Sequence, residues 1–394
     1  MTNAWTGATG AFMMARVARI RVYFAHVGVN METQQPRRSG PARAISAIAL
    51  TLTLVATACG GNATAPSAGT TAPAAAATAT PKPAPEKIIF LTDFLLWGWH
   101  APIFAAKAQG FFADQNLDVT IQAGKGSVDG GVQLGAGSVQ FSLIDISTAL
   151  LAQSKGADFK LVGVHLQQFP GSLLYIKERT TINSWKGIEG KKLGGARGDA
   201  YFTVLPGLMK DAGADPTKYS LVDIDGALTT GALISGQVDA IPGSAMTAPP
   251  RAAAAAKEGL TLARFSFADN GYKALGFSVA VNGKVLREKP DVVQRFVNAW
   301  AKATLWTLVN RDKAVGDFLA ANPDKQKELE TQSFIASEPM IKGDGTYFAF
   351  DPAKLKLNVD FVNAQYGSTL KIDDVYTNQF VQKLPAGYTQ GKLQ

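Results

Sequence analysis

Residues 87–117 read KIIFLTDFLLWGWHAPIFAAKAQGFFADQNL, and this stretch decides the fold class. Its first six residues are mostly apolar and include two isoleucines, which predicts a short strand. Residues 102–109 then predict a helix, with Gly110 placed to end it, and residues 117–121 predict a second strand. A strand, a helix and a strand in succession are typical of a parallel sheet covered by helices.

The same alternation runs through most of the chain and predicts two α/β lobes. Further strands and helices are expected in lobe 1 at 128–134, 140–143, 146–154 and 161–165. In lobe 2 and the segment after it, they are expected at 192–194, 200–211, 219–223, 228–235, 239–241, 275–281, 291–309 and 351–365. The expected parts of the chain are a leader and signal peptide at 1–58, a tether at 59–86, lobe 1 at 87–190 and 273–394, and lobe 2 at 191–272.

Length and composition bound the function. The 394 residues leave room for two lobes of ordinary domain size, and 46% hydrophobic residues are enough for a sizeable core. Of the formal net charge of +8, residues 1–58 hold six arginines against one glutamate, which leaves only +3 for the rest. The remaining basic residues are spread among acidic ones and do not form the dense positive surface that nucleic acid binding needs. We therefore expect no nucleic acid partner.

The N-terminal region predicts export. Arg37, Arg38 and Arg43 precede an apolar stretch, residues 44–58, which ends in small residues. At about 15 residues this stretch is shorter than the roughly 20 residues that span a bilayer as a helix, so we expect it to be cleaved. A start at Met31 would give a leader of conventional length.

Cys59 is the only cysteine and follows the apolar stretch directly. The sequence LVATAC at 54–59 resembles the lipobox of bacterial lipoproteins, which implies a lipid anchor on Cys59. The alternative is a chance cysteine in a signal peptide that is cut elsewhere. Residues 60–86 are rich in Ala, Thr, Pro and Gly and predict a flexible tether. We expect the protein at the outer face of the cytoplasmic membrane or in the periplasm.

Short motifs along the lobes occur in an order that resembles a known family. They are HAP at 100–102, GFF at 110–112, NLDV at 116–119, GKGSV at 124–128 and ISGQVDA at 234–240. Together they are similar to the solute-binding proteins of thiamine-precursor, riboflavin, taurine, sulfonate and nitrate importers, the NMT1/THI5-like and SsuA-like family. The resemblance implies a periplasmic binding protein fold of type II, with two lobes that are joined by two crossing strands and close over a solute. It also implies a permease and an ATPase of the ATP-binding-cassette type as partners, and we expect a monomer.

Aromatic residues follow the first expected strand. Trp97, Trp99 and His100 come shortly after it, and ligands of open α/β sheets sit outside the carboxyl ends of the strands. We therefore expect these side chains in the cleft, where the aromatic faces would stack on a flat heterocycle. The alternatives are that one tryptophan packs in the core and that His100 only fixes the turn before Pro102.

Two further groups follow strands of lobe 1. Gly124, Gly126 and Ser127 stand between a strand and a helix, where backbone amides could bind a phosphate, a sulfonate or a carbonyl oxygen. The alternative for them is an ordinary turn and helix start. Asp145 follows the strand at 140–143 and could accept hydrogen bonds from an aminopyrimidine or a ribityl hydroxyl. Its alternative role is the N-cap of the next helix.

Lobe 2 offers a similar turn. Arg197, Asp199 and Tyr201 lie between an expected strand and an expected helix. Tyr201 would supply a second aromatic wall, whereas Asp199 is equally suited to be an N-cap and Arg197 to be a solvated side chain. Asp239 and Ser244 border the next expected strand, and both carry hydrogen-bonding groups. All five are candidates for ligand binding.

We expect no catalysis and no cofactor. The family resemblance extends to fungal pyrimidine synthases, which carry a cysteine-rich motif, whereas this chain has only Cys59. After removal of the leader, His100 and His165 are the only histidines, which excludes a metal site made of several histidines and thiolates. We expect His165, at the end of a strand, to be structural.

The expected solute is a flat heteroaromatic nutrient, such as riboflavin or a pyrimidine precursor of thiamine. The reason is that the cleft-facing candidates are aromatic and include no obvious cationic clamp. The runner-up is an alkanesulfonate, taurine or nitrate. A different class of function also fits the sequence, namely a receptor with the same fold that senses the solute instead of handing it to an importer.

Overall fold

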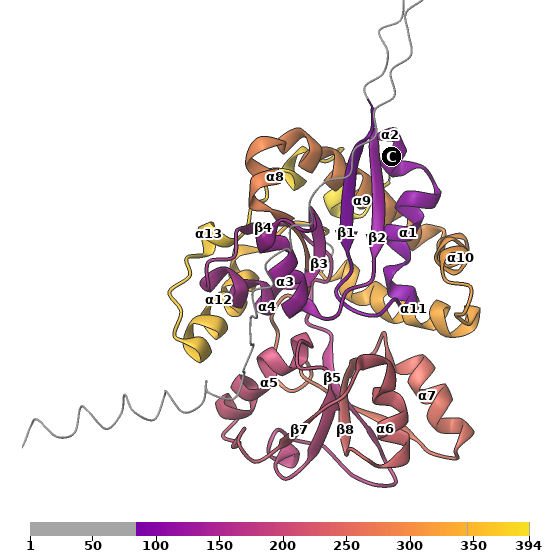
Figure 1. The fold of residues 1–394 in the computed structure, drawn as a ribbon, viewed down its shortest axis with the longest axis vertical. Coiled ribbons are helices and arrows are strands. Elements are labelled where there is room, and N and C mark those ends of the chain that lie inside the picture. Colours follow the sequence, from indigo (N-terminus) through magenta and orange to yellow (C-terminus); the bar gives the residue numbers. More distant parts are fainter. Residues whose placement is uncertain (1–83, 345, 394) are drawn as a thin grey trace, which may run out of the picture. The chain divides into compact units, whose positions relative to one another are not determined.

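The computed structural model describes residues 84–344 and 346–393. They hold two five-stranded sheets with helices around them (Figure 1). The strand order is β2-β1-β3-β10-β4 in the first sheet and β7-β6-β8-β5-β9 in the second. The expected α/β class with two lobes is thereby confirmed. Cys59 and most of the expected tether lie outside the described residues.

The first sheet is the centre of lobe 1, which we define by the structure as residues 84–164 and 277–393. Its strands are β1 (Glu86–Leu91), β2 (Leu117–Gln122), β3 (Phe141–Asp145), β4 (Phe159–Val164) and β10 (Phe277–Asn282). Its helices are α1 (Ala101–Ala108), α2 (Phe111–Asp114), α3 (Ser127–Ala136), α4 (Ile146–Ser154), α8 (Gly283–Glu288), α9 (Pro290–Val309), α10 (Arg311–Ala321), α11 (Lys327–Lys342), α12 (Pro352–Tyr366) and α13 (Ile372–Val375), with the 3-10 turns η1 (Gly98–His100), η4 (Val381–Lys383) and η5 (Tyr388–Gln390).

The second sheet is the centre of lobe 2, residues 171–266. Its strands are β5 (Gly171–Ile176), β6 (Lys192–Gly195), β7 (Ser220–Asp223), β8 (Ala240–Ser244) and β9 (Leu262–Ser266). Its helices are α5 (Ala200–Asp211), α6 (Thr229–Ser235) and α7 (Ala248–Lys257), with the 3-10 turns η2 (Lys186–Ile188) and η3 (Gly226–Leu228). Among all the described residues, no helix is both long enough and apolar enough to cross a membrane.

Each sheet is mixed and not purely parallel. In lobe 1, β1 pairs in parallel with β2 and β3, whereas β10 lies antiparallel between β3 and β4. The chain path explains the difference, because the chain leaves lobe 1 after β4, builds lobe 2 and returns through β10 from the opposite direction. In lobe 2, β5 is antiparallel to β8 and β9 for the same reason.

The boundary between the lobes differs from the sequence-based expectation, which extends lobe 1 to residue 190. The apolar run GSLLYI, which forms β5, already pairs with β8 and β9 of the second sheet. The chain therefore enters lobe 2 directly after β4, about twenty residues earlier than the alternating pattern indicates. The return to lobe 1 at β10 lies close to the expected position.

Two crossing segments, residues 165–170 and 267–276, join the lobes and hydrogen bond to each other. The backbone N–H of Phe169 donates to the carbonyl oxygen of Ala274 at 2.9 Å, and the N–H of Gly276 donates to that of Leu166 at 3.0 Å. His165 begins the first segment and is buried against Trp99. Burial and the neighbouring His100 lower the pKa of His165 to about 3, so its imidazole is neutral at ordinary pH.

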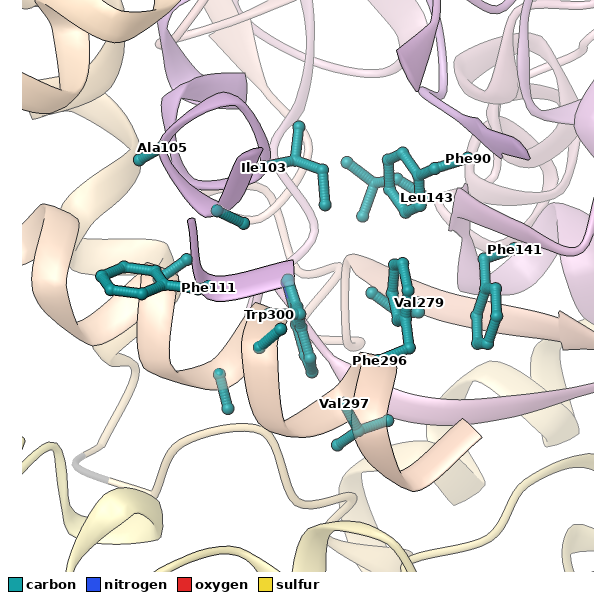
Figure 2. Close-up of a cluster of buried hydrophobic side chains, with 14 of the residues drawn as sticks. Phe90, Ile103, Ala105, Phe111, Phe141, Leu143, Val279, Phe296, Val297 and Trp300 are labelled. Carbon is teal, nitrogen blue, oxygen red and sulfur yellow. The ribbon is translucent and has the colours of Figure 1, made fainter. Parts of the chain in front are cut away.

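The core of lobe 1 forms where α9 packs on the sheet. Figure 2 shows Phe296 and Val297 of α9 near Phe141 of β3 and Val279 of β10. The rings of Phe296 and Phe141 stack with centroids 4.0 Å apart and an interplanar angle of 12°. The helical spacing of apolar residues in 291–309 predicts this helix. Its buried face packs against the strands of the sheet, and pocket residues follow the carboxyl ends of this sheet.

Candidate functional site: a pocket between the lobes

A pocket lies between the two lobes, next to the carboxyl ends of β1, β6 and β8. Its empty space is about 490 Å³, a volume that includes open solvent at the mouth. The lining residues of lobe 1 are Asp93, Phe94, Trp97, Trp99, Gly126, Ser127 and Phe277. Those of lobe 2 are Asp199, Ala200, Tyr201, Pro242, Gly243, Ser244, Met246, Thr247 and Arg251. Because both lobes contribute, the pocket exists only while the lobes are together.

Most of the residues chosen from the sequence line this pocket. They are Trp97, Trp99, Gly126, Ser127, Asp199, Tyr201 and Ser244. Contact between these residues and a solute stays a prediction. Trp99 is only 2% exposed, and its ring packs against His100 with centroids 4.1 Å apart and edge-on against Phe277 at 5.6 Å. Trp99 therefore belongs largely to the core of lobe 1, although it also lines the pocket.

Asp145 lies behind the pocket wall and does not line it. Its backbone N–H donates to the Ser127 hydroxyl at 3.0 Å, and its Oδ1 caps α4 by accepting the N–H of Thr148 at 2.7 Å. Its Oδ2 is buried without a hydrogen-bond partner among the described residues. Burial raises the pKa of this carboxyl to about 7, against the opposing effect of the Thr148 hydrogen bonds.

Arg197 and Asp239 also lie outside the pocket. The side chain of Arg197 is 72% exposed, and its Nε is 2.9 Å from Oδ2 of Asp223. Asp239 immediately precedes β8, so it lies at the amino end of a strand whose carboxyl end reaches the pocket. There its Oδ2 accepts the N–H of Lys192 at 2.7 Å. Both residues border a strand, and this position does not by itself determine the direction of a side chain.

His100 does not line the pocket but holds a residue that does. Its Nε2 is 2.8 Å from Oδ1 of Asp93, and a carboxylate can only accept, so Nε2 carries the proton. Nδ1 then accepts the backbone N–H of Trp97 at 3.1 Å. The imidazole therefore fixes both the aspartate and the turn. Asp93 has no motif of its own, although its position two residues after β1 is a signal that the strand rule offers.

Helix α11 contacts the turn that carries Trp97 and fixes its backbone. The backbone N–H of Gly98 donates to Oε2 of Glu330 at 2.5 Å, and a Cβ at Gly98 would lie 1.9 Å from the Glu330 carbonyl oxygen. Only glycine permits this approach. The Trp97 ring is near two cations, with Lys325 Nζ 5.1 Å and the Arg251 guanidinium carbon 5.4 Å from its centroid.

Asp199 and Tyr201 begin α5 at the lobe 2 wall. Oδ1 of Asp199 caps the helix by accepting the N–H of Tyr201 at 2.9 Å. Burial raises the pKa of Asp199 to about 6, and the charge of Asp93 adds to the rise while Arg251 opposes it. Burial also raises the pKa of Tyr201, which keeps its hydroxyl protonated. The wall thus combines a carboxyl group that titrates near neutral pH with a phenol ring and its O–H.

Arg251 is a cationic residue that the sequence does not reveal as part of the site. It lies on α7, is only 5% exposed, and donates through Nη1 to the Pro242 carbonyl oxygen at 3.2 Å and to the Thr247 hydroxyl at 3.0 Å. The candidates from the sequence include no obvious cationic clamp, and the structure adds Arg251 as a cation on the pocket wall. The only sequence signal is a single basic residue in the run APPRAAAAA, one helical turn into a helix that follows β8.

Loops of the two lobes touch beside the pocket. The N–H of Val128, at the start of α3, lies 3.5 Å from the carbonyl oxygen of Gly198. On another side, a Cβ at Gly226 would lie 2.2 Å from the Phe94 ring, so these two residues are also in contact. Met246 of lobe 2 belongs to the apolar cluster of lobe 1. The structure therefore shows the lobes closed over the pocket.

The pocket is equipped for recognition. Asp93 and Asp199 supply carboxylate acceptors, Arg251 and the indole of Trp97 supply donors, and the aromatic rings supply flat apolar faces. In the part of the chain that the structure describes, no group of three or more His, Cys, Asp or Glu side chains is placed to hold a metal ion. This arrangement can bind a small molecule that has a flat body and polar groups at its edges.

Comparison with known proteins agrees with this geometry. A model of the family described as NMT1/THI5 like matches residues 97–314. The 4-amino-5-hydroxymethyl-2-methylpyrimidine phosphate synthase THI13 of Saccharomyces cerevisiae is 26% identical over 260 residues, which cover 64% of this chain and 76% of the synthase. A putative aliphatic sulfonates-binding protein of Bacillus subtilis is 23% identical over 301 residues, which cover 74% of this chain and 87% of that protein.

Solved structures show the same fold. The alkanesulfonate-binding protein SsuA of Xanthomonas axonopodis pv. citri, bound to MOPS, has a TM-score of 0.60 at 15% identity and covers 76% of this chain and 100% of its own. The periplasmic aliphatic sulphonate binding protein SsuA of Escherichia coli has a TM-score of 0.57 at 15% identity and covers 77% of this chain and 99% of its own. At these identities the likeness concerns the fold alone.

Proposed function

Because the chain belongs to the NMT1/THI5-like family, we propose that it is the exported solute-binding component of an importer of the ATP-binding-cassette type. We further propose that its solute is a flat, aminated heterocycle of the aminopyrimidine kind. The observation that carries the proposal is the closed pocket, to which both lobes contribute aromatic rings and one carboxylate each, Asp93 and Asp199.

The two carboxylates favour a solute with N–H donors. A carboxylate accepts hydrogen bonds and does not donate them, and the exocyclic amino group of an aminopyrimidine supplies two donors. Burial already raises the pKa of Asp199 to about 6, which means that its charged form is poorly solvated. A bound amino group would restore the lost hydrogen bonds of that charge. The rings of Trp97 and Tyr201 would cover the faces of a flat ring system.

We propose that the protein binds its solute without converting it. The relatives named as synthases are enzymes by name, but the sole cysteine of this chain is Cys59, in the leader region. The seven lining residues of lobe 1 and the nine of lobe 2 contain no thiol and no imidazole. Closure of the lobes about the crossing segments would then be the functional event, and the closed form is the one that a permease would recognise.

Attachment to the membrane through Cys59 is part of the proposal. The residue lies outside the described residues, and its support is the lipobox-like sequence LVATAC at 54–59. Mass spectrometry of the protein from a membrane fraction should find a diacylglyceryl group on Cys59, and Cys59→Ser should move the protein to the soluble fraction. An unmodified Cys59 in membrane-bound protein would rule out the anchor. We propose that the protein acts as a monomer, which light scattering after gel filtration would test.

A second candidate solute is taurine or another alkanesulfonate. The observation that favours it is Arg251, a buried cation on the pocket wall, together with the relatives and neighbours that are named for sulfonate binding. Asp93 and Asp199 oppose a simple anion such as nitrate, because they place two negative charges beside one positive charge. Taurine avoids this conflict, since its ammonium group would face the carboxylates.

A thermal-shift panel tests the proposal and separates the candidates. The panel contains 4-amino-5-hydroxymethyl-2-methylpyrimidine, riboflavin, taurine, an alkanesulfonate and nitrate. A solute at about 100 times its Kd stabilises the folded state by about 2.7 kcal/mol, which for lobes of this size raises Tm by roughly 5 to 10 °C.

We expect the aminopyrimidine to raise Tm and Asp199→Asn to reduce the shift. The exposed, non-lining variant Arg197→Ala is the matched control and should keep it. If the aminopyrimidine and riboflavin leave Tm unchanged while taurine raises it, the heterocycle is excluded and the sulfonate candidate replaces it.

A further inference from the structure

Arg251 is a buried cation whose hydrogen-bond donors are only partly used. It is only 5% exposed, and the nearby Asp199 acts on it through its charge, but no hydrogen bond joins Arg251 to a carboxylate among the described residues. Its two hydrogen bonds both use Nη1, and its Nε has no partner among the described residues. A guanidinium stays protonated in proteins, and burying one of its N–H donors without an acceptor is costly. A side chain needed only to hold Pro242 and Thr247 could do so without a charge.

A second donor beside Arg251 is also unpaired. The indole Nε1 of Trp97 is buried without a hydrogen-bond partner in the described part of the chain. The Arg251 guanidinium carbon lies 5.4 Å from the centroid of the Trp97 ring, so the two residues meet across the lobes. Both side chains line the pocket. Lys325, with its Nζ 5.1 Å from the same ring, adds positive charge nearby.

We infer that Arg251 and Trp97 form an anion subsite that binds a carboxylate, sulfonate or phosphate group carried by the solute. This inference rests on the proposed function, since it concerns the same pocket. An anionic oxygen at the subsite would accept from Arg251 Nε and Trp97 Nε1, the two buried donors that have no acceptor among the described residues. With Asp93 and Asp199 as acceptors for amino groups, the solute is amphoteric, with an acidic group at one end and N–H donors at the other.

The subsite also gives Arg251 a role in closure. Arg251 belongs to lobe 2 and Trp97 to lobe 1, so an anion bound by both would join the lobes directly. A neutral analogue would fill the pocket but leave both donors without an acceptor. Leaving buried donors unpaired is the kind of defect that discriminates strongly between ligands of similar size.

Isothermal titration with two matched pairs of solutes tests the subsite. The first pair is 4-amino-2-methylpyrimidine-5-carboxylate and 4-amino-2-methylpyrimidine, and the second is taurine and 2-aminoethanol. We expect the acidic member of at least one pair to bind at least tenfold more tightly than its neutral partner. Arg251→Gln should remove that preference, so that the acidic and neutral members of the pair bind about equally.

Trp97→Phe is the second variant, because it keeps an aromatic ring but removes the N–H donor together with the pyrrole part of the indole. It should reduce the preference for the acidic member by a smaller factor, and it is informative even if Arg251→Gln does not fold.

Equal binding of acidic and neutral members, or an equal loss of both in each variant, would overturn the subsite and leave the proposed function standing. If only the taurine pair binds, with taurine preferred, the subsite stands and the heterocycle does not. If none of the four solutes binds, the proposed function fails and the subsite with it.

Discussion

Gly126 of lobe 1 and Gly198 of lobe 2 lie in direct backbone contact beside the pocket. A Cβ at Gly126 would be 2.3 Å from the carbonyl oxygen of Gly198, and the φ of Gly126 is +123°, a conformation that favours glycine. At Gly198, by contrast, a Cβ would have ordinary contacts, 3.6 Å from the Lys125 carbonyl oxygen and 3.8 Å from Cβ of Val128. At this contact between the lobes there is no room for a side chain on Gly126, and there is room for only a small one on Gly198.

A large side chain at Gly198 should hold the lobes apart. We expect Gly198→Phe to weaken solute binding about tenfold, equivalent to about 1.4 kcal/mol, and to prevent the compaction that X-ray scattering should detect when solute is added. Gly231→Phe is the matched control, because a Cβ at that helical position meets no atom within 4 Å. Binding and compaction by Gly198→Phe equal to those of the unaltered protein would contradict the closed contact.

The affinity for an aminated solute should depend on the charge of Asp199. Burial and the charge of Asp93 raise its pKa to about 6, while Arg251 opposes the rise. Below that pH the carboxyl is protonated and loses acceptor strength, so the affinity should fall about tenfold per pH unit at most as the pH drops from 6 to 5. Titration calorimetry of the unaltered protein and of Asp199→Asn, with the same solute, cancels the titration of the solute itself. The same pH profile in both proteins would exclude Asp199.

Asp145 should make the protein less stable as the pH rises. Burial raises its folded-state pKa from the ordinary 3.8 to about 7, so the folded state holds the proton more tightly than the unfolded chain. Its contribution to the free energy of unfolding is fully present below pH 4 and is lost as the pH rises through 7. The loss is on the order of 4 kcal/mol.

Denaturant unfolding of Asp145→Asn at pH 5 and pH 8 measures this effect, because asparagine keeps the N-cap acceptor and carries no charge. The variant should gain stability relative to the unaltered protein between the two pH values. Asp351→Asn, at the exposed N-cap of α12, is the matched control. A stability difference for Asp145→Asn that stays constant with pH would contradict the raised pKa.

His100 should act through Asp93 and not by touching the solute. His100→Phe removes the hydrogen bond to Asp93 and the one to the Trp97 N–H. Hydrogen bonds to charged groups contribute about 1.5 to 3 kcal/mol, so we expect solute affinity to fall by at least tenfold. In the Asp93→Asn background the same change should have a much smaller effect. Equal losses in both backgrounds would show that His100 acts independently of Asp93.

The sequence predicts the parts of the fold that repeat a simple pattern. The helix expected at 291–309 is observed as Pro290–Val309, because its apolar residues recur at helical spacing. The family resemblance, based on the order of short motifs, is confirmed as well. The sequence pattern does not predict β5 or β9. β5 is uniformly buried and lacks the alternation of a half-buried strand, and it lies inside the segment that the sequence assigns to lobe 1.

The candidate site is predictable only in part. Trp97, Ser127 and Tyr201 were found because residues that follow a strand gather at one edge of the sheet. Arg251 could not be found in this way, since it reaches the pocket from within α7. Arg197 follows the same rule but points to solvent, because the rule places a residue at an edge without fixing the direction of its side chain.

Equilibrium dialysis of the full chain against 4-amino-2-methylpyrimidine-5-carboxylate, followed by mass spectrometry of the retained solute, tests the central claim most directly. We predict that one solute is retained per chain, that it is recovered chemically unchanged, and that Asp199→Asn retains far less. Retention by the unaltered protein no greater than by Asp199→Asn, or recovery of a converted product, would contradict the account.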